Sequence, residues 1–210
     1  MANFGCHELI LSQPRTHDLR AADRIAVHSE GILDSMMVVP TLDEALAGVV
    51  YAVGSTSRDQ LRRQTPLSPE AAVAKLSEHS ARGKVALVLG GERRGLSDDD
   101  LSRCHDVLVI DTDDAQPSMN LSHAAAVLLY ECSRASATAP AQPPGAELGF
   151  VHKLEALMKE TLIASEFLRA DGPQHALMEL QRSLVRGGLT AREAQVWYSA
   201  FVHLRRSLKR

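Results

Sequence analysis

Short apolar runs rich in β-branched residues alternate with helix-start signals along the first 134 residues of this chain. The runs predict strands at 8–11, 37–39, 49–53, 85–89 and 107–110. Between them, Thr41, Ser68 and Ser97 each stand where a hydroxyl can cap the first turn of a helix. Strands that alternate with helices and are apolar throughout are typical of a mostly parallel sheet covered on both faces. The sequence therefore predicts an α/β domain at residues 1–134.

A proline- and alanine-rich stretch follows the predicted α/β domain. Residues 135–145 are small and uncharged, which indicates a linker, and we place that linker at 135–149. Helical patterns follow at 150–168, at 173–185 and after Thr190, which forms a capping-box pattern with Glu193. The last pattern has apolar residues at helical spacing, which predicts a face packed in a core or on a partner: Trp197, Phe201, Leu204 and Leu208. Residues 150–210 are thus predicted to form a helical extension.

Charge is distributed unevenly along the chain. The net charge is −3, but residues 151–210 carry ten Lys or Arg against six Asp or Glu, a balance of +4 that leaves −7 for the rest. A basic tail on an acidic body indicates a polyanionic partner for the tail, although a solvated helix surface would show the same charges.

Composition narrows the class of protein. A hydrophobic content of 45% and a charged content of 23% are those of a well-cored globular protein. The longest apolar run, 124–130, is far shorter than the roughly 20 residues of a membrane span, so no membrane association is predicted. Cys6, Cys104 and Cys132 are widely spaced, and no CxxC, HxH or HExxH pattern occurs. Neither disulfides nor a metal site is therefore predicted, and a reducing cytoplasm is the expected compartment.

A glycine turn follows the strand predicted at 85–89. Residues 90–96 read Gly-Gly-Glu-Arg-Arg-Gly-Leu, and glycines directly after a strand let the backbone approach a ligand closely. The run contains no Gly-Lys-Ser/Thr of a P-loop, no GxGxxG of a dinucleotide site and no GxSxG of a hydrolase. The turn could also be purely structural.

A second polar segment follows the strand predicted at 107–110. Residues 117–122 read Pro-Ser-Met-Asn-Leu-Ser and come directly before an apolar helical run. Asn120 could serve only as the cap of that helix.

The two segments in this order resemble the second and third motifs of the SpoU branch of the SPOUT RNA methyltransferases. The resemblance covers most of residues 8–134, and the tail at 150–208 is similar to the carboxy-terminal extension of the TrmJ-type subgroup. Members of that subgroup methylate the ribose 2′-oxygen of nucleotide 32 in the tRNA anticodon loop. The resemblance implies an α/β fold with a deep trefoil knot, an exception to unknotted connectivity. It also implies S-adenosylmethionine as cofactor, tRNA as partner and a homodimer formed through the knot.

The resemblance assigns roles to residues of this chain. Those implied to hold the cofactor are Ser55, Thr56, Ser57, Gly90, Ile110, Pro117, Ser118 and Met119. Those implied to position the cofactor and the ribose for catalysis are Glu92, Ser118 and Asn120. In the tail, the expected RNA phosphate contacts are Arg182, Arg186, Arg192, Arg205 and Arg206.

One family feature has no counterpart in this sequence. The first family motif, Asn-x-Gly-x-x-x-Arg on a helix before the first strand, carries the arginine thought to activate the ribose hydroxyl. This chain shows no such motif, and residues 1–5 resemble the end of that helix. Either the sequence starts at an internal methionine or it is a natural variant without the arginine. We expect the chain as given to transfer methyl groups slowly.

Three other functions stay open at this point. An rRNA 2′-O-methyltransferase and a catalytically impaired RNA-binding protein would both use the same fold. A nucleotide-dependent oxidoreductase would use an ordinary doubly wound sheet, but the absence of GxGxxG disfavours it.

Overall fold

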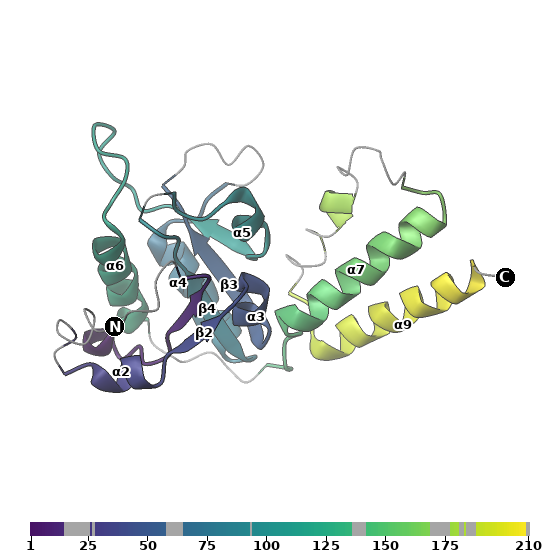
Figure 1. Cartoon of the computed structure of the whole chain (residues 1–210), viewed down its shortest axis with the longest axis horizontal. Coiled ribbons are helices and arrows are strands. Elements are labelled where there is room, and N and C mark those ends of the chain that lie inside the picture. The colour runs from purple at the N-terminus through teal and green to yellow at the C-terminus, as the bar shows by residue number, and fades with distance from the viewer. Residues whose placement is uncertain are drawn as a thin grey trace.

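The computed structural model consists of an α/β body and a helical extension that lies beside it (Figure 1). It describes residues 1–14, 26, 28–57, 65–92, 94–135, 142–168, 177–180, 183 and 188–208. Part of the predicted linker, 136–141, and most of the helix predicted at 173–185 lie outside the described residues, although 177–180 and 183 are helical.

Every strand of the body pairs in parallel with its neighbours. In the larger sheet, β3 (Val49–Ser55) lies between β4 (Lys84–Val88) and β5 (Asp106–Leu108). In the smaller sheet, β1 (Ile10–Ser12) pairs with β2 (Met37–Val39). The five predicted strands are present within two residues of their predicted starts. The mostly parallel α/β fold is therefore confirmed.

Helices begin at the predicted caps. The body contains η1 (Ala2–Phe4), α2 (Glu30–Asp34), α3 (Leu42–Leu46), α4 (Pro69–Ser80), α5 (Asp98–Ser102) and α6 (Leu121–Arg134). The side-chain oxygens of Thr41, Ser68 and Ser97 accept hydrogen bonds from the backbone N–H groups three residues further on. Each bond satisfies one of the donors that a helix start leaves unpaired.

The core lies on both faces of β3, whose residues Val49–Gly54 are all buried. One cluster contains Leu46 of α3, Leu101 of α5 and Leu148. The other contains Leu76 of α4 and Leu128 of α6. Helices thus cover both faces of the central strand, as the uninterrupted apolar run predicted.

The extension is built on two helices of 17 residues, α7 (Leu148–Ala164) and α9 (Ala191–Ser207). Both start next to the body and run side by side in the same direction away from it (Figure 1). The rings of Phe150, near the start of α7, and Tyr198, near the middle of α9, are 5.4 Å apart, and further along Arg205 pairs with Glu160. The helix predicted at 150–168 in fact begins at Leu148, within the predicted linker, because that leucine is fully buried in the body's core.

Candidate functional site

Three strand ends of the larger sheet open into one cavity. Because β3, β4 and β5 are parallel, the segments that follow them leave the sheet at the same edge, where ligands of α/β proteins bind. A cavity of about 160 Å³ lies there, and the segment before α6 closes it. Its lining consists of Ser55, Thr56, Ser57, Gly90, Gly91, Glu92, Gly95, Ile110, Thr112, Pro117, Ser118, Met119, Leu121 and Ala124.

All eight residues predicted to hold a cofactor line this cavity, and Glu92 lines it too. Gly91, Gly95, Thr112, Leu121 and Ala124 were not predicted. Leu121 and Ala124 are three residues apart on the first turn of α6 and share one side of the helix, so helical spacing could have found them. Thr112 had no recognisable signal in the sequence.

The glycine turn is held closed by its own backbone. The N–H of Gly95 donates to the carbonyl of Gly91 at 2.9 Å, and Gly95 has a φ of 64°, which favours glycine. A Cβ on Gly90 would lie 2.1 Å from the carbonyl carbon of Gly95. Gly90 is therefore required by the turn itself, before any ligand is considered. A Cβ on Gly91 would meet no atom within 4 Å, so Gly91 has open space beside it.

Asn120 is the cap of α6. Its side-chain oxygen accepts hydrogen bonds from the N–H of Ser122 at 2.9 Å and from the hydroxyl of Ser122 at 2.7 Å. Asn120 is not among the residues that line the cavity, whereas its neighbours Ser118, Met119 and Leu121 are. Asn120 therefore has the helix-capping role that its position in the sequence indicated. Its role in positioning the ribose stays a prediction.

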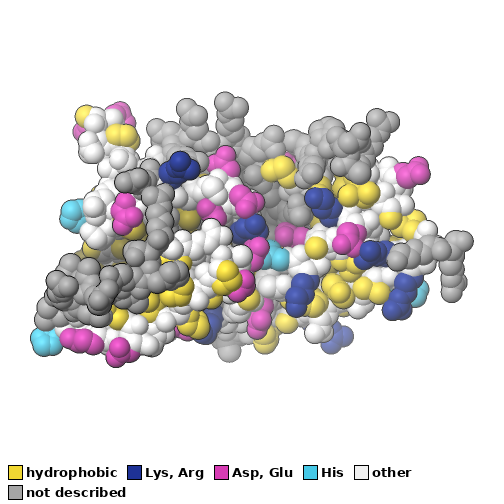
Figure 2. Space-filling model, in the orientation of Figure 1, with side chains coloured by type: hydrophobic (Ala, Val, Ile, Leu, Met, Phe, Trp, Pro, Cys, Tyr) yellow, Lys and Arg dark blue, Asp and Glu magenta, His cyan; other side chains and the backbone are white. Residues whose placement is uncertain are grey.

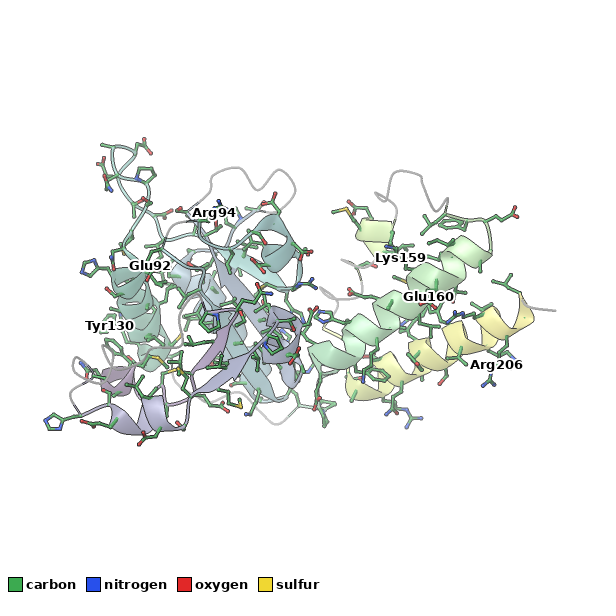
Figure 3. The ribbon with its side chains drawn as sticks, viewed as in Figure 1. Glu92, Arg94, Tyr130, Lys159, Glu160 and Arg206 are labelled. Carbon is green, nitrogen blue, oxygen red and sulfur yellow. The ribbon has the colours of Figure 1, made fainter. Side chains whose placement is uncertain are left out.

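Among the described residues that line the cavity, Glu92 is the only ionisable one. The other polar lining groups are hydroxyls and backbone amides, which can hold and orient a ligand but are poor bases at neutral pH. Figure 3 shows Glu92 and Arg94 on the same side of the body.

Strongly perturbed groups lie elsewhere, in a polar cluster between β3, α4 and β5. The hydroxyl of Tyr51 donates to the carboxylate of Asp106, which also pairs with Lys75 at 2.7 Å. The ring of Tyr51 stacks on His79 with centroids 4.1 Å apart. Burial, and then the hydrogen bond to Asp106, raise the pKa of Tyr51 above its ordinary value. The cluster ties the strands to α4, and none of its residues lines the cavity.

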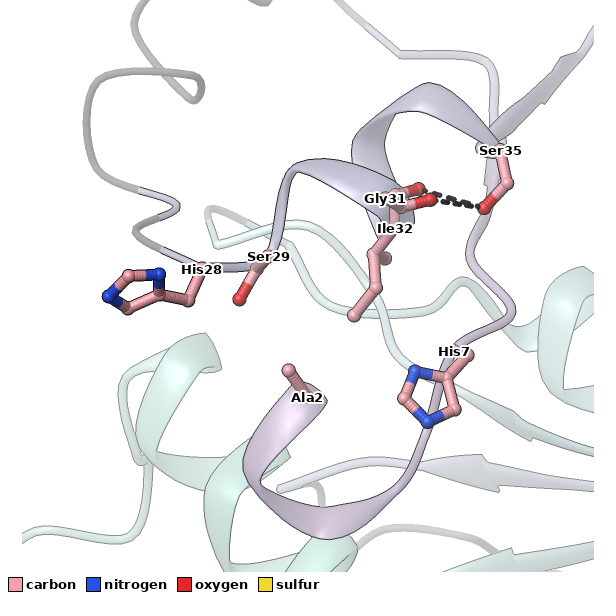
Figure 4. A pocket seen from close by; sticks show the side chains of 7 residues that line it. All are labelled: Ala2, His7, His28, Ser29, Gly31, Ile32 and Ser35. Carbon is pink, nitrogen blue, oxygen red and sulfur yellow. Dashed lines mark hydrogen bonds between the residues drawn. The ribbon is translucent and has the colours of Figure 1, made fainter.

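A second hollow of about 310 Å³ lies between η1 and α2 (Figure 4). It contains none of the predicted site residues. The hydroxyl of Ser35 is already used within α2, where it donates to the carbonyl of Gly31 at 2.7 Å. The cavity at the strand ends, where hydroxyl groups and a glycine turn converge, is therefore the candidate functional site.

The predicted RNA contacts divide into two kinds. Arg192 and Arg206 are exposed on α9, and Arg206 is labelled in Figure 3. Arg205 instead pairs with Glu160 of α7 at 2.5 Å. Arg182 and Arg186 lie outside the described residues. Dark blue side chains are frequent over the extension in the space-filling view (Figure 2).

The described part of the chain holds no cluster of three or more His, Cys, Asp or Glu side chains that could bind a metal ion. It also holds no helix of the length and apolarity that a bilayer span requires.

A parallel α/β body with a glycine-turn cavity at its strand ends defines an α/β protein with a candidate ligand site at the carboxyl edge of its sheet. The family model for SpoU rRNA methylases matches residues 1–130. The chain therefore belongs to the SpoU rRNA methylase family, and the predicted family is confirmed.

Individual relatives extend the similarity into the extension. The tRNA (cytidine/uridine/adenosine-2′-O-)-methyltransferase TrmJ of Pseudomonas aeruginosa is 33% identical over 211 residues, covering 93% of this chain and 82% of the relative. The tRNA (cytidine/uridine-2′-O-)-methyltransferase TrmJ of Klebsiella pneumoniae is 30% identical, covering 93% of this chain and 84% of the relative. The crystal structure of TrmJ from Z. mobilis matches with a TM-score of 0.84 at 23% identity, over 97% of this chain and 89% of that one. Body and extension thus share a known fold.

Proposed function

We propose that this protein transfers a methyl group from S-adenosylmethionine to a ribose 2′-oxygen of tRNA, at nucleotide 32 of the anticodon loop. The observation that carries the proposal is the convergence of all eight expected cofactor residues on one cavity. The relatives named tRNA 2′-O-methyltransferases, which cover both body and extension, support tRNA rather than rRNA as the substrate.

The lining of the cavity fits this cofactor. Its apolar wall, formed by Ile110, Leu121 and Ala124, suits the flat face of an adenine. The hydroxyls of Ser55 and Ser57, together with the backbone of the glycine turn, offer hydrogen bonds to polar groups of the ligand. When bound, S-adenosylmethionine supplies a sulfonium methyl that an oxygen nucleophile can attack.

The chain's own residues must align the ribose and remove its proton. Ser118 lines the cavity and can hydrogen-bond the ribose. Asn120 lies two residues further on and has an amide N–H₂ group besides the oxygen that caps α6. Glu92 is the group among the lining residues that can accept the hydroxyl proton. Orientation of the reacting groups contributes several kcal/mol to lowering such a barrier, about 7–11 at the best.

The trefoil knot and a homodimer formed through it are part of this proposal. Met119, which lines the cavity, and two side chains further along α6, Val127 and Tyr130, are exposed apolar groups. A second copy packed there would cover them. Sedimentation analysis should give twice the mass of the chain.

A pair of neighbouring substitutions on α6 tests the cavity assignment. Ala124→Leu adds volume inside the cavity, while His123→Leu makes an adjacent change at an exposed residue that does not line it. Calorimetry should show at least a tenfold loss of S-adenosylmethionine affinity for Ala124→Leu and little change for His123→Leu. Equal affinities would place the cofactor elsewhere. Binding of NAD in place of S-adenosylmethionine would favour the oxidoreductase.

One observation favours a second candidate, an RNA-binding protein that transfers methyl groups poorly. None of the described residues that line the cavity is basic, whereas a positive charge there would help to stabilise a developing oxyanion. Binding of tRNA and S-adenosylmethionine without any methylated product would identify this candidate.

A further inference from the structure

The extension joins the body through a short ladder of backbone hydrogen bonds. The N–H of Gly145 donates to the carbonyl of Arg82 at 3.1 Å, which ties the segment before α7 to the turn after α4. Ala146 then donates to Leu189 at 2.8 Å, and Ala191 donates to Pro144 at 3.0 Å. The segments before α7 and α9 are thus paired with each other next to the end of α4.

The side chain of Arg82 bonds to both segments of this ladder. Its Nη2 donates to the carbonyl of Gly188 at 2.8 Å, and its Nε donates to the carbonyl of Pro143 at 3.4 Å. These partners are 106 and 61 residues away in sequence. A guanidinium presents its donors in a rigid planar fork, so two carbonyls bonded to one Arg82 are held in a fixed relative position.

Arg82 acts at the point where α9 begins. Gly188 has a φ of 55° and lies two residues before Thr190, whose capping box with Glu193 starts the helix. The hydrogen bonds from Thr190 lower the pKa of Glu193, and the positive charge of Arg82 adds a smaller contribution. Arg82 is therefore bonded to the segment that leads directly into α9.

The start of α7 is fixed by different means. Leu148 is fully buried in the core of the body, and the N–H of Gly149 donates to the carbonyl of Ala47 at 3.1 Å. The attachment of α9 to the body depends far more on hydrogen bonds, with Arg82 at their centre. Because α9 is 17 residues long, about 25 Å, a small change in its starting direction moves its basic far end by several ångströms.

We propose that Arg82 is a positioning residue for RNA methylation. It sets the direction of α9 relative to the cavity, so that RNA held on the extension presents its ribose at the strand ends. This inference rests on the proposed function for its consequence in catalysis, but not for the contact itself.

Three variants distinguish the effect of losing the hydrogen bonds of Arg82 from the effect of losing its positive charge. Arg82→Gln removes the fork and the charge. Arg82→Lys keeps the charge but cannot bridge two carbonyls in the same way. Lys84→Gln removes the same charge two residues away, at a side chain that is 64% exposed and pairs with Glu8 within the body.

Hydrogen exchange at the ladder tests the contact without reference to activity. The amides of Gly145, Ala146 and Ala191 should exchange at least tenfold faster in Arg82→Gln than in the wild-type protein. They should be unchanged in Lys84→Gln, and the amide of Val53 in β3 should keep its protection in every variant. Unchanged exchange at the ladder in Arg82→Gln would overturn the proposal.

Steady-state kinetics test the consequence. For Arg82→Gln, kcat/KM for tRNA should fall by about 10- to 100-fold, as expected for a misplaced substrate, while S-adenosylmethionine affinity stays the same. Arg82→Lys should recover part of the loss, and Lys84→Gln should match the wild-type protein. An equal loss in Lys84→Gln would make charge the cause and overturn the positioning role. Absence of any methylation by the wild-type protein would contradict the proposed function, and the exchange measurement would then decide the role of Arg82 alone.

Discussion

At the scale of single residues, His105 shows how a buried side chain couples the fold to pH. It is 5% exposed, and its Nδ1 accepts a hydrogen bond at 3.1 Å from the N–H of Ala52 in β3. Accepting at Nδ1 requires the neutral ring with its proton on Nε2. Burial, assisted by His79, lowers the pKa of His105 to about 4.

The lowered pKa of His105 predicts acid destabilisation. The unfolded chain binds this proton more readily than the folded protein, so stability is full above pH 6.5 and falls as the pH drops towards 4. The contribution of His105 to this loss should be about 1–3 kcal/mol. Urea unfolding of His105→Asn between pH 7 and 4 should show a shallower decline than the wild-type protein. The exposed control His203→Asn should keep the wild-type decline, and an equal decline in both variants would contradict this account.

Single residues also show the limit of a resemblance. It placed Gly90 at the cofactor, and Gly90 does line the cavity, but its lack of a Cβ is explained by the backbone of Gly95 and Leu96. A substitution at Gly90 would distort the turn and could not isolate cofactor binding. The close approach of Gly90 to the backbone of Gly95 and Leu96 depends on the three-dimensional closure of the turn. The order of residues alone does not show this closure.

At the scale of elements, α6 has a cap with two possible roles. Asn120→Ala removes the capping oxygen and should cost about 1 kcal/mol of stability. Asn120→Asp keeps a capping oxygen, so its stability should stay within about 0.5 kcal/mol of the wild-type value. If the amide also positions the ribose, Asn120→Asp should lose methyl transfer by at least tenfold. Thermal unfolding and product formation should be measured on the same variants. Full methyl transfer by Asn120→Asp would show that Asn120 only caps α6.

Elements also show what the sequence could predict. Strands and caps were predictable because their signals are local, as with the buried run of β3 and the hydroxyls of Ser68 and Ser97. The face of α9 that packs against α7 could not be predicted in this way. Of the apolar stripe, Trp197 is 47% exposed and Leu204 is 54% exposed.

The helix packs on α7 through a different set of residues. Ala194 is fully buried, Tyr198 contacts Phe150 and Arg205 pairs with Glu160. A small residue and a charged one carry no hydrophobic signal, so this face depends on its partner helix and could not be predicted from periodicity.

At the scale of the whole molecule, the basic extension beside an acidic body predicts salt-dependent RNA binding. Phosphate contacts release counterions, so each contact that is lost should flatten the slope of log affinity against log salt by about one unit. Arg192→Gln and Arg206→Gln should each do so in filter binding with tRNA. Arg205→Gln is the matched control, because that guanidinium already pairs with Glu160, and its effect should be smaller. Equal slopes in the wild-type protein and in both test variants would remove α9 from the RNA interface.

The central claim is the transfer of a methyl group to a ribose oxygen of tRNA. The most direct test incubates the protein with methyl-labelled S-adenosylmethionine and tRNA, then digests the RNA and identifies the labelled nucleotide. The identity of the labelled product decides the outcome, and not the rate of transfer. The account predicts label in a 2′-O-methylated nucleotide at position 32, none in tRNA with a 2′-deoxy sugar there, and none with Ala124→Leu. Label on a base, or label that persists in the 2′-deoxy tRNA, would contradict it.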